Sequence, residues 1–242
     1  MSLRALRQYV ELYHLNGIAD FFIESKEFKM DVTAVSLGDK KHSYTGGIHI
    51  NDLNGLRQKC VNCTDCSLRK SRVKMVFGEG NPKADVMIIS DPPNSDENMQ
   101  GRPFVGEAGI VFGNMMKNVL NFERNDLYMT NIVKCRCMIS GANTVQNNYR
   151  VEYYDINEMR KCLPYLHQQI DMIKPRFILV MGEIAASVLF EKRESIDYFR
   201  NNQGVLYKGI PVYVTYNPAE LVVNTGLKRL ALVDLKVFLA RR

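Results

Sequence analysis

Short apolar runs alternate with helical patterns along most of this chain of 242 residues, and this alternation constrains the fold more than any other feature. Four runs have the length and apolar character of strands buried on both faces: residues 85–91, 126–133, 176–181 and 211–216. The segments with helical spacing of apolar residues are 105–122, 155–173, 182–190 and 227–239. Strands that alternate with helices pair in parallel and are covered on both faces. We therefore predict an α/β fold of three layers, α/β/α, with a four-stranded, mostly parallel central sheet.

The first 48 residues follow a different pattern from the rest of the chain. Leu3, Leu6, Val10 and Tyr13 are spaced in steps of three and four, which predicts a helical extension over residues 1–26. Residues 27–48 are polar and contain three glycines, a composition typical of a linker. We expect the α/β domain to occupy residues 49–242, and we expect the N-terminal helix either to dock on another protein or to fold back.

The composition excludes several classes of protein. Hydrophobic residues make up 46% of the chain and charged residues 24%, the balance of a globular domain rather than of a disordered or fibrous chain. No apolar run approaches the roughly 20 residues that a membrane-spanning helix needs. Charged residues interrupt the apolar residues of the N-terminus, which is unlike a signal peptide. We therefore expect a cytoplasmic monomer with no membrane partner.

Basic residues exceed acidic ones by 32 to 26, which gives a formal net charge of +6. Part of this excess is clustered along residues 57–74 and near the C-terminus. A cluster of Lys and Arg attracts a polyanion, and nucleic acid is the natural one. The same charges also keep a protein soluble, so the pattern alone leaves both interpretations open.

Six cysteines are grouped in a way that favours a metal site. The first three are two residues apart from one another, and the others follow far downstream: Cys60, Cys63, Cys66, Cys135, Cys137 and Cys162. Without an export signal, disulfides are not expected. Four thiolates suit zinc or an iron–sulfur cluster, and the spacing does not choose between them. The alternative is a set of scattered buried cysteines that act as small apolar residues.

Polar residues follow the predicted strands at their carboxyl ends, where ligands gather in open parallel sheets. The segments at these ends are 90–94, 131–135, 182 and 217–220. Asp91 and Asn131 are therefore expected to face the same crevice. Asp91 precedes two prolines, which fix the backbone there. A carboxylate at this place is also typical of a helix N-cap or a turn, and this second interpretation stays open.

Several short motifs occur in a familiar order and spacing: CTDCSL from residue 63, VFGEGNP from 76, DENMQGRPFVGEAG from 96, TNIVKC from 130, CLPYL from 162, VMGEIAA from 180 and TYNPAEL from 215. They resemble the family 4 uracil-DNA glycosylases, the iron–sulfur members of their superfamily, over about residues 55–242. The resemblance implies a four-stranded parallel sheet between helices, uracil-containing DNA as the substrate, and a role in DNA repair. It also implies a cytoplasmic, nucleoid-associated protein.

The resemblance implies a [4Fe–4S] cluster with a structural role. By position its ligands would be Cys63, Cys66, Cys135 and Cys162. Cys60 and Cys137 would then be spare, although Cys60 and Cys63 form an alternative pair. The polar stretch 140–154 between the third and fourth ligands looks like an inserted loop.

The resemblance also assigns roles in base recognition. A glycosylase takes its target base out of the stack before it cuts the bond to the sugar. By position, Phe104 would stack on the uracil and Asn131 would recognise its polar edge, with Ser90 and Pro92 as further substrate contacts. Core packing is the alternative role for Phe104. The residues expected to contact DNA phosphates are Arg69, Lys70, Arg72, Arg102, Lys228 and Arg229. The segment 219–227 is expected to probe the duplex, and packing of its Leu221, Val222 and Val223 in the core is the alternative.

Two positions depart from the family's motifs. Asp91 stands where the family has Glu, and it is shorter by about 1.5 Å, one carbon–carbon bond. Asn217 stands where the family has His. Loss of one donor to a leaving group typically costs about 10²–10³ in rate. We expect a glycosylase with a retuned or weakened site, in which Asp91 orients water and Asn217 assists the leaving group. The alternative is a catalytically impaired protein that binds uracil or DNA and retains the cluster.

Overall fold

The structure is a computed structural model that describes residues 52–137 and 155–242. These residues all belong to the second of the chain's two structural units, residues 34–242. The predicted helical extension, the linker, the first residues of the α/β domain and the predicted insertion at 140–154 lie outside the described residues. They stay predictions.

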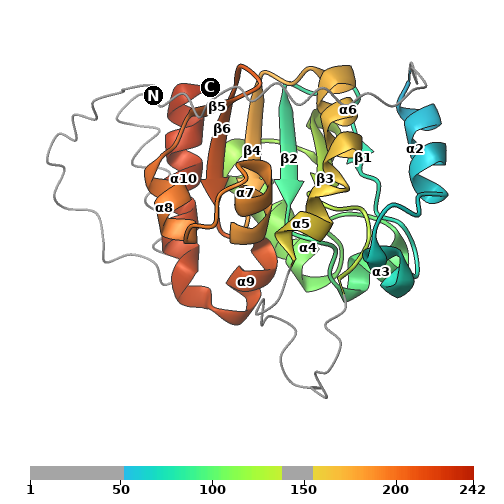
Figure 1. Cartoon of the computed structure of the whole chain (residues 1–242). Coiled ribbons are helices and arrows are strands. Elements are labelled where there is room, and N and C mark those ends of the chain that lie inside the picture. The colour runs from blue at the N-terminus through green and yellow to red at the C-terminus, as the bar shows by residue number, and fades with distance from the viewer. Residues whose placement is uncertain (1–51, 138–154) are drawn as a thin grey trace, which may run out of the picture. The chain divides into compact units, whose positions relative to one another are not determined.

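A six-stranded sheet forms the centre of the described residues, in the order β1-β3-β2-β4-β6-β5 (Figure 1). The four inner strands are parallel: β2 (Val86–Ser90), β3 (Leu127–Asn131), β4 (Phe177–Met181) and β6 (Ile210–Thr215). These are the four strands that the sequence predicts. The prediction of a four-stranded sheet is wrong at both edges, where β1 (Glu79–Gly80) and β5 (Val205–Tyr207) add antiparallel pairs.

Both edge strands are too short to produce a recognisable pattern. β1 has two residues and β5 has three. β5 is joined to β6 by Lys208 and Gly209, both of which have positive φ, at +50° and +79°. Two consecutive residues with positive φ make the tight hairpin turn that matches the twist of antiparallel strands. A Lys-Gly pair is a weaker hairpin signal than Asn-Gly, so sequence reasoning missed the turn.

Helices surround the sheet. Their bounds are α2 (Leu53–Val61), α3 (Ser95–Gln100), α4 (Gly106–Met115), α5 (Ile156–Arg160), α6 (Leu163–Ile173), α7 (Glu183–Leu189), α8 (Ile196–Asn201), α9 (Pro218–Val223) and α10 (Lys228–Arg241). Single turns complete the set: η1 (Ser67–Ser71), the π-turn η2 (Met116–Leu120), η3 (Arg124–Asp126) and η4 (Thr225–Leu227). The helix predicted over 155–173 is two helices. Pro164 in the first turn of α6 cannot donate a backbone hydrogen bond, so the helix restarts at Cys162.

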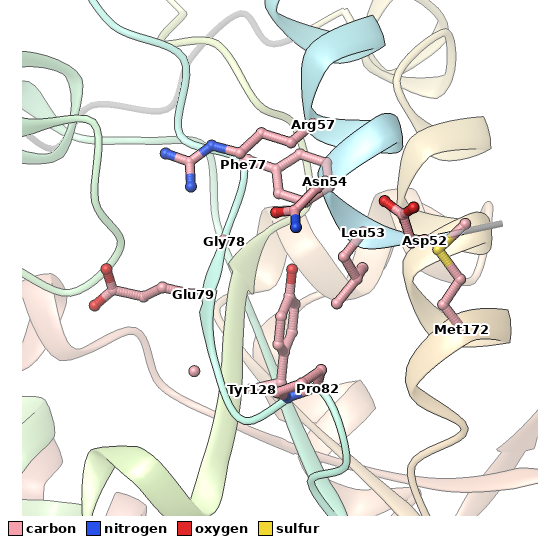
Figure 2. A pocket seen from close by; sticks show the side chains of 11 residues that line it. Asp52, Leu53, Asn54, Arg57, Phe77, Gly78, Glu79, Pro82, Tyr128 and Met172 are labelled. Carbon is pink, nitrogen blue, oxygen red and sulfur yellow. The ribbon is translucent and has the colours of Figure 1, made fainter. Parts of the chain in front are cut away.

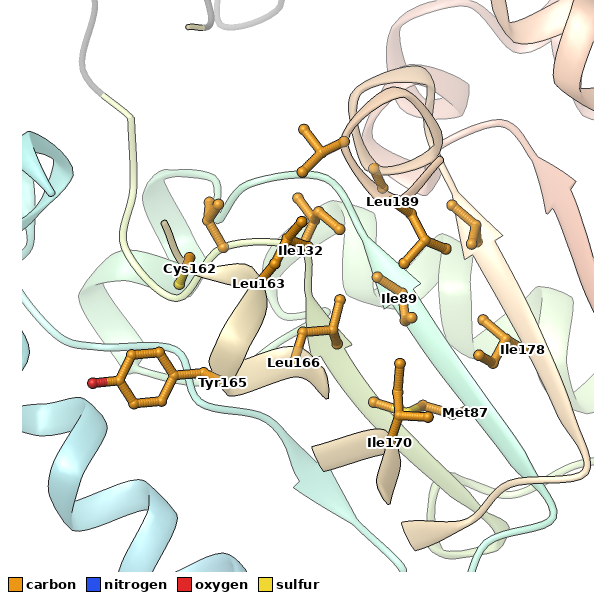
Figure 3. Close-up of a cluster of buried hydrophobic side chains, with 14 of the residues drawn as sticks. Met87, Ile89, Ile132, Cys162, Leu163, Tyr165, Leu166, Ile170, Ile178 and Leu189 are labelled. Atoms are coloured by element: carbon orange, nitrogen blue, oxygen red, sulfur yellow. The ribbon is translucent and has the colours of Figure 1, made fainter. Parts of the chain in front are cut away.

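Successive residues of each inner strand face opposite sides of the sheet, and each side has its own core. Met87 and Ile89 of β2 pack with α2, α5, α6 and α7, as Figure 3 shows for part of this cluster. Val86 and Ile88 pack on the other side with residues of α4, η2 and α10. Parallel strands buried on both faces explain the continuous apolar runs of the sequence.

Candidate functional site

The carboxyl ends of the inner strands meet at one edge of the sheet. Ser90 at the end of β2 pairs with Asn131 of β3 and with Met181 of β4, and Met181 pairs with Thr215 of β6. The residues that follow these ends therefore lie close together. The Asn131 Nδ2 atom donates a hydrogen bond of 2.8 Å to the backbone carbonyl of Asp91, and Asn217 Nδ2 donates one of 3.0 Å to Asp91 Oδ2.

The Asp91 carboxylate is held between two elements. Its Oδ1 accepts a hydrogen bond of 2.8 Å from the backbone N–H of Ala185, in the first turn of α7, and its Oδ2 accepts from Asn217. Asp91 therefore lies at the strand ends, as predicted, and it is not the N-cap residue of either neighbouring helix, since Asn94 caps α3 and Gly182 precedes α7. Burial raises the pKa of Asp91 to about 7, and the charges of Glu220 and Glu183 add to this effect. The carboxyl group therefore changes charge near neutral pH.

Gly182 makes room for this carboxylate. It has a φ of +118°, and a Cβ atom at this position would lie 2.0 Å from Asp91 Oδ2. Any side chain would thus displace the carboxylate and also require a backbone conformation that other residues avoid. A glycine is needed here to keep Asp91 in place.

Asn217 uses both of its polar side-chain atoms within the protein. Its Oδ1 accepts a hydrogen bond of 2.9 Å from the backbone N–H of Ala219, which caps α9, and Pro218 occupies the first position of that helix. Its Nδ2 donates to Asp91 and lies 3.3 Å from Ser90 Oγ. In this conformation its amide donor is engaged by Asp91.

Asn131 is fully buried, and its side-chain amide oxygen, Oδ1, has no hydrogen-bond donor. The Nδ2 atom donates to the carbonyl of Asp91, and it also lies 3.5 Å from Glu97 Oε2. These two acceptors fix which end of the amide is nitrogen. No donor in residues 52–137 or 155–242 contacts Oδ1. A buried acceptor without a donor costs about 1–3 kcal/mol, so its presence indicates a place for a ligand donor.

Phe104 is 4% exposed and packs in the core beside α4. One face of its ring stacks on Phe112, with ring centroids 3.9 Å apart and an interplanar angle of 14°. Its φ of +52° is unusual for a bulky residue. Arg124 Nη1 donates to its carbonyl at 3.1 Å, which helps to hold this conformation. The packing interpretation is thus correct for one face of the ring.

Glu97 is the residue that sequence reasoning missed. Its carboxylate is buried and accepts a hydrogen bond of 2.6 Å from the backbone N–H of Phe104. The other oxygen accepts from the backbone N–H of Asn94, which completes the capping box of α3, and faces the Asn131 amide. Burial raises the pKa of Glu97. The spacing of Asn94 and Glu97 was a visible signal, but it indicates a helix start rather than a site.

The two further predicted substrate contacts adjoin Asp91. Ser90 is buried, and its Oγ lies within reach of the Asn217 amide. Pro92 is half-buried. The predicted site residues Ser90, Asp91, Asn131 and Asn217 are therefore brought together. Phe104 joins them through Glu97, which contacts both the Phe104 backbone and the Asn131 amide.

The cysteines of the described residues are all free thiols and influence one another. Burial is the main cause of the raised pKa of Cys135, and the thiols of Cys66 and Cys63 raise it further. Burial likewise raises the pKa of Cys162, and the thiols of Cys135 and Cys66 add to the effect. Cys60 and Cys137 are part of the same group, because each is coupled to Cys162 and Cys135. Among the described residues, no three His, Cys, Asp or Glu side chains are close enough to hold a single metal ion.

A buried lysine lies among these thiols. Lys134 is 1% exposed, and its Nζ donates to Thr130 Oγ1 at 2.5 Å and to the carbonyl of Asn131 at 2.8 Å. Burial lowers its pKa to about 8, and the thiols of Cys162, Cys60 and Cys135 oppose this effect. The backbone N–H of Lys134 also donates to Cys162 Sγ at 3.4 Å. Lys134 thus connects the cysteines with the carboxyl end of β3.

The basic residues predicted to contact DNA differ in their surroundings. Arg69 and Lys70 are exposed on η1, directly after Cys66, and Lys228 and Arg229 are exposed at the start of α10. Arg72 is half-buried with Nη1 3.8 Å from Cys135 Sγ. Arg102 forms two hydrogen bonds, of 2.8 and 3.0 Å, with the Glu79 carboxylate. Its guanidinium is therefore already paired in this structure.

A hollow of about 570 Å³ lies elsewhere, between α2, β1 and β3 (Figure 2). Tyr128, Phe77 and Arg57 are among the residues that line it, and none of the predicted site residues does. The strand ends, where the buried polar groups gather, are the better candidate for a functional site. No helix in the described part of the chain has the length and apolar character needed to cross a membrane.

Comparison with known proteins agrees with this geometry. Residues 77–236 match the model of the uracil DNA glycosylase superfamily. A type-4 uracil-DNA glycosylase of Sulfurisphaera tokodaii is 34% identical over 77% of this chain and 83% of its own length. The type-4 uracil-DNA glycosylase of Pyrobaculum aerophilum is 35% identical over 77% of this chain and 93% of its own length. The type-4 uracil-DNA glycosylase of Thermotoga maritima is 30% identical over 74% of this chain and 88% of its own length. The matched region contains the four inner strands with the residues at their ends, and on these grounds the chain belongs to the uracil-DNA glycosylase superfamily.

Proposed function

We propose that this protein removes uracil from DNA by hydrolysing the N-glycosidic bond, as the names of its type-4 relatives suggest. The observation that carries the proposal is the unsatisfied side-chain oxygen, Oδ1, of the buried Asn131. Uracil has an N–H donor at N3, whereas the N3 of cytosine is an acceptor. A fixed Asn131 Oδ1 can therefore accept a hydrogen bond from N3 of uracil. It disfavours cytosine, because the N3 acceptor of cytosine would face this oxygen, which is also an acceptor.

Phe104 serves this pocket as a stacking surface. One face of its ring rests on Phe112, and the other is the face to which a flat base would bind. Glu97 holds the Phe104 backbone and the Asn131 amide at once, so it fixes the stacking surface relative to the polar edge of the base. Ser90 and Pro92 complete the wall of the pocket beside Asp91.

The chemistry divides between Asp91 and Asn217. The bond from C1′ of the sugar to N1 of uracil breaks and the base leaves with the electron pair. Water adds to C1′ and gives up a proton, which the uracil anion takes up in the end. Asp91 in its ionised form would orient that water and stabilise the positive charge that develops on the sugar. Asn217 would donate to the departing uracil through Nδ2, which must first release Asp91. A neutral amide polarises the leaving oxygen less than an imidazolium would, so the rate is expected to be low.

The cysteines fit an iron–sulfur cluster, which this family assignment implies. The supporting observation is that Lys134 is buried directly before Cys135 and donates its backbone N–H to Cys162 Sγ. Cys63, Cys66, Cys135 and Cys162 would hold a [4Fe–4S] cluster, and Cys60 and Cys137 would remain thiols. When bound, the cluster would cross-link the η1 segment, the end of β3 and the start of α6, a structural role.

Contacts with DNA would be mostly with phosphates. Arg69, Lys70, Lys228 and Arg229 are exposed and suit this role, with Arg72 beside the cysteines. Arg102 would have to exchange Glu79 for a phosphate. The segment 219–227, which contains the exposed Val223, would probe the duplex. The protein would act as a monomer in the cytoplasm at the nucleoid, with residues 1–26 as a contact site for repair or replication proteins.

A second function is favoured by one specific observation. Asp91 and Asn217 satisfy each other, and Asn217 also caps α9, so neither group is free to act on a substrate in this conformation. A protein in which this arrangement persists would bind uracil in DNA without excising it. Such a protein would keep the base pocket and the cluster and serve as a sensor of damaged DNA.

Single-turnover cleavage of an oligonucleotide with one uracil tests the proposal, combined with a binding measurement on the same DNA. Excision by the native protein, abolished in Asn131→Ala and retained in Asn157→Ala, is the expected result. Asn157 is an exposed asparagine on α5, far in sequence from the site, and serves as the matched control. Preferential binding of uracil DNA without cleavage would support the second function. Equal binding of uracil-containing and uracil-free DNA, without cleavage, would exclude both.

A further inference from the structure

Lys134 is one of the largest fully buried side chains of the described residues. Its ammonium group has two neutral hydrogen-bond acceptors, Thr130 Oγ1 and the carbonyl of Asn131. A charged group in a protein interior is costly unless a charge of opposite sign lies close to it. The burial of Lys134 therefore requires a negative charge nearby.

Carboxylates do not supply that charge among the described residues. No Asp or Glu of residues 52–137 or 155–242 forms an ion pair with Lys134, while surface lysines such as Lys161, Lys192 and Lys208 each have one. Cysteine sulfurs adjoin Lys134 instead: Cys135 directly follows it, and its backbone N–H donates to Cys162 Sγ at 3.4 Å. Both cysteines are predicted cluster ligands.

The backbone places Lys134 between the cluster and the base pocket. Lys134 directly precedes Cys135, and its N–H donates to the sulfur of Cys162. Its carbonyl accepts a hydrogen bond of 2.9 Å from Val76, which fixes the segment from the other side. The side chain then turns back along the chain and bonds to the carbonyl of Asn131, the residue whose amide is proposed to recognise uracil.

We propose that Lys134 is the buried counter-cation of the iron–sulfur cluster and that it ties the cluster to the Asn131 end of β3. This inference rests on the proposed function, because it requires the cluster. Four thiolates around a cubane carry net negative charge, and a buried ammonium stabilises that charge where water cannot. Lys134 is a positioning residue, because it acts on the base through Asn131 and not by contact.

A fixed positive charge next to a cluster raises its reduction potential, because the reduced form carries one more negative charge. Removing the charge should lower the potential of whichever couple is observed. We expect Lys134→Met to make reduction at least tenfold less favourable, which is about 59 mV for a one-electron couple. Lys134→Arg keeps the charge and should keep most of the potential.

The experiment is protein-film voltammetry on the protein with its cluster, together with iron analysis of each variant. Lys59→Met is the matched control: Lys59 directly precedes Cys60, so it carries the same charge near the same thiols, but it is exposed and screened by water. The expected result is a lowered potential in Lys134→Met alone. Equal potentials in Lys134→Met and Lys59→Met would overturn the inference.

Iron analysis separates the possible failures. Native protein that binds no iron would refute the proposed cofactor itself and leave no role for Lys134. If Lys134→Met accumulates without iron, Lys134→Arg decides the matter. Retention of iron in Lys134→Arg would support a role of the charge, and loss of iron there would show that shape, not charge, is what the site requires.

Discussion

The pH dependence of uracil excision offers the sharpest test of Asp91. Its ordinary pKa of 3.8 is raised to about 7, mainly because burial disfavours the ionised carboxylate, and Glu220 and Glu183 add repulsion. This difference favours the protonated form by about 4 kcal/mol relative to water. At one pH unit below the pKa, about one carboxyl group in ten is ionised. If the ionised form orients water, activity must follow that fraction.

The measurement is the single-turnover rate of cleavage at saturating protein, from roughly pH 5 to pH 9, so that DNA binding does not limit the rate. We expect the rate to rise about tenfold for each pH unit below the pKa of Asp91 and to level off above it. Asp91→Asn should remove this rise and lower the plateau. Asp85→Asn is the control, because Asp85 directly precedes the other end of β2 and its side chain is exposed.

Two results would refute this reasoning. A flat profile for the native protein would mean that no group titrating near neutral pH takes part in the slow step. A rise that persists in Asp91→Asn would assign the titration to another buried carboxyl group. Glu97 and Glu220 are the candidates, since burial raises the pKa of both.

Three further outcomes are expected. Because the pKa of Asp91 is raised in the folded state, its contribution to the free energy of unfolding is complete near pH 4 and is lost as the pH rises towards 7. Asp91→Asn should therefore gain stability relative to the native protein over that interval, by up to about 4 kcal/mol, as measured by chemical denaturation. Gly182→Ala should lower the melting temperature more than Gly209→Ala, because both have positive φ but only the first would meet Asp91. The double change Asp91→Glu with Asn217→His should raise the excision rate by about 10²–10³ in the single-turnover assay, and no gain would count against the assignment of these residues.

The inner strands were predictable because a strand that is buried on both faces has a continuous apolar sequence. The residues Val86–Ser90 and Phe177–Met181 are buried without exception, and an unbroken apolar run of this length is typical of a strand inside a parallel sheet. The edges had no comparable signal, since Glu79–Gly80 is half exposed and only two residues long. The break at Cys162 was also missed. Met159 and Leu163 continue one apolar face across it, and the apolar pattern therefore runs on where the hydrogen bonds stop.

The convergence of Asp91, Asn131 and Asn217 was predictable for a similar reason, because parallel strands bring their carboxyl ends to one edge. The direction of each side chain was not. That Asn217 engages its amide with Asp91, or that Asn131 leaves its oxygen unpaired, depends on contacts between segments up to 126 positions apart. No local pattern encodes them. The spacing of Asn94 and Glu97 indicates a helix start, so it does not single out Glu97 as a site residue.

Asp91 and Asn217, the two predicted departures from the family's motifs, are coupled through one contact. The short Asp91 side chain meets Asn217 at 3.0 Å and is also held by α7, while Asn217 is held by α9. A longer acid alone would press on Gly182 or lose its bond to Ala185, and an imidazole alone would lose the cap of α9. Each single change thus leaves a partner unsatisfied, and such losses cost about 1–3 kcal/mol when the group is buried. The double change carries both costs, but it alone restores a donor for the leaving base together with a carboxylate that reaches the water, so we expect either substitution by itself to yield little activity.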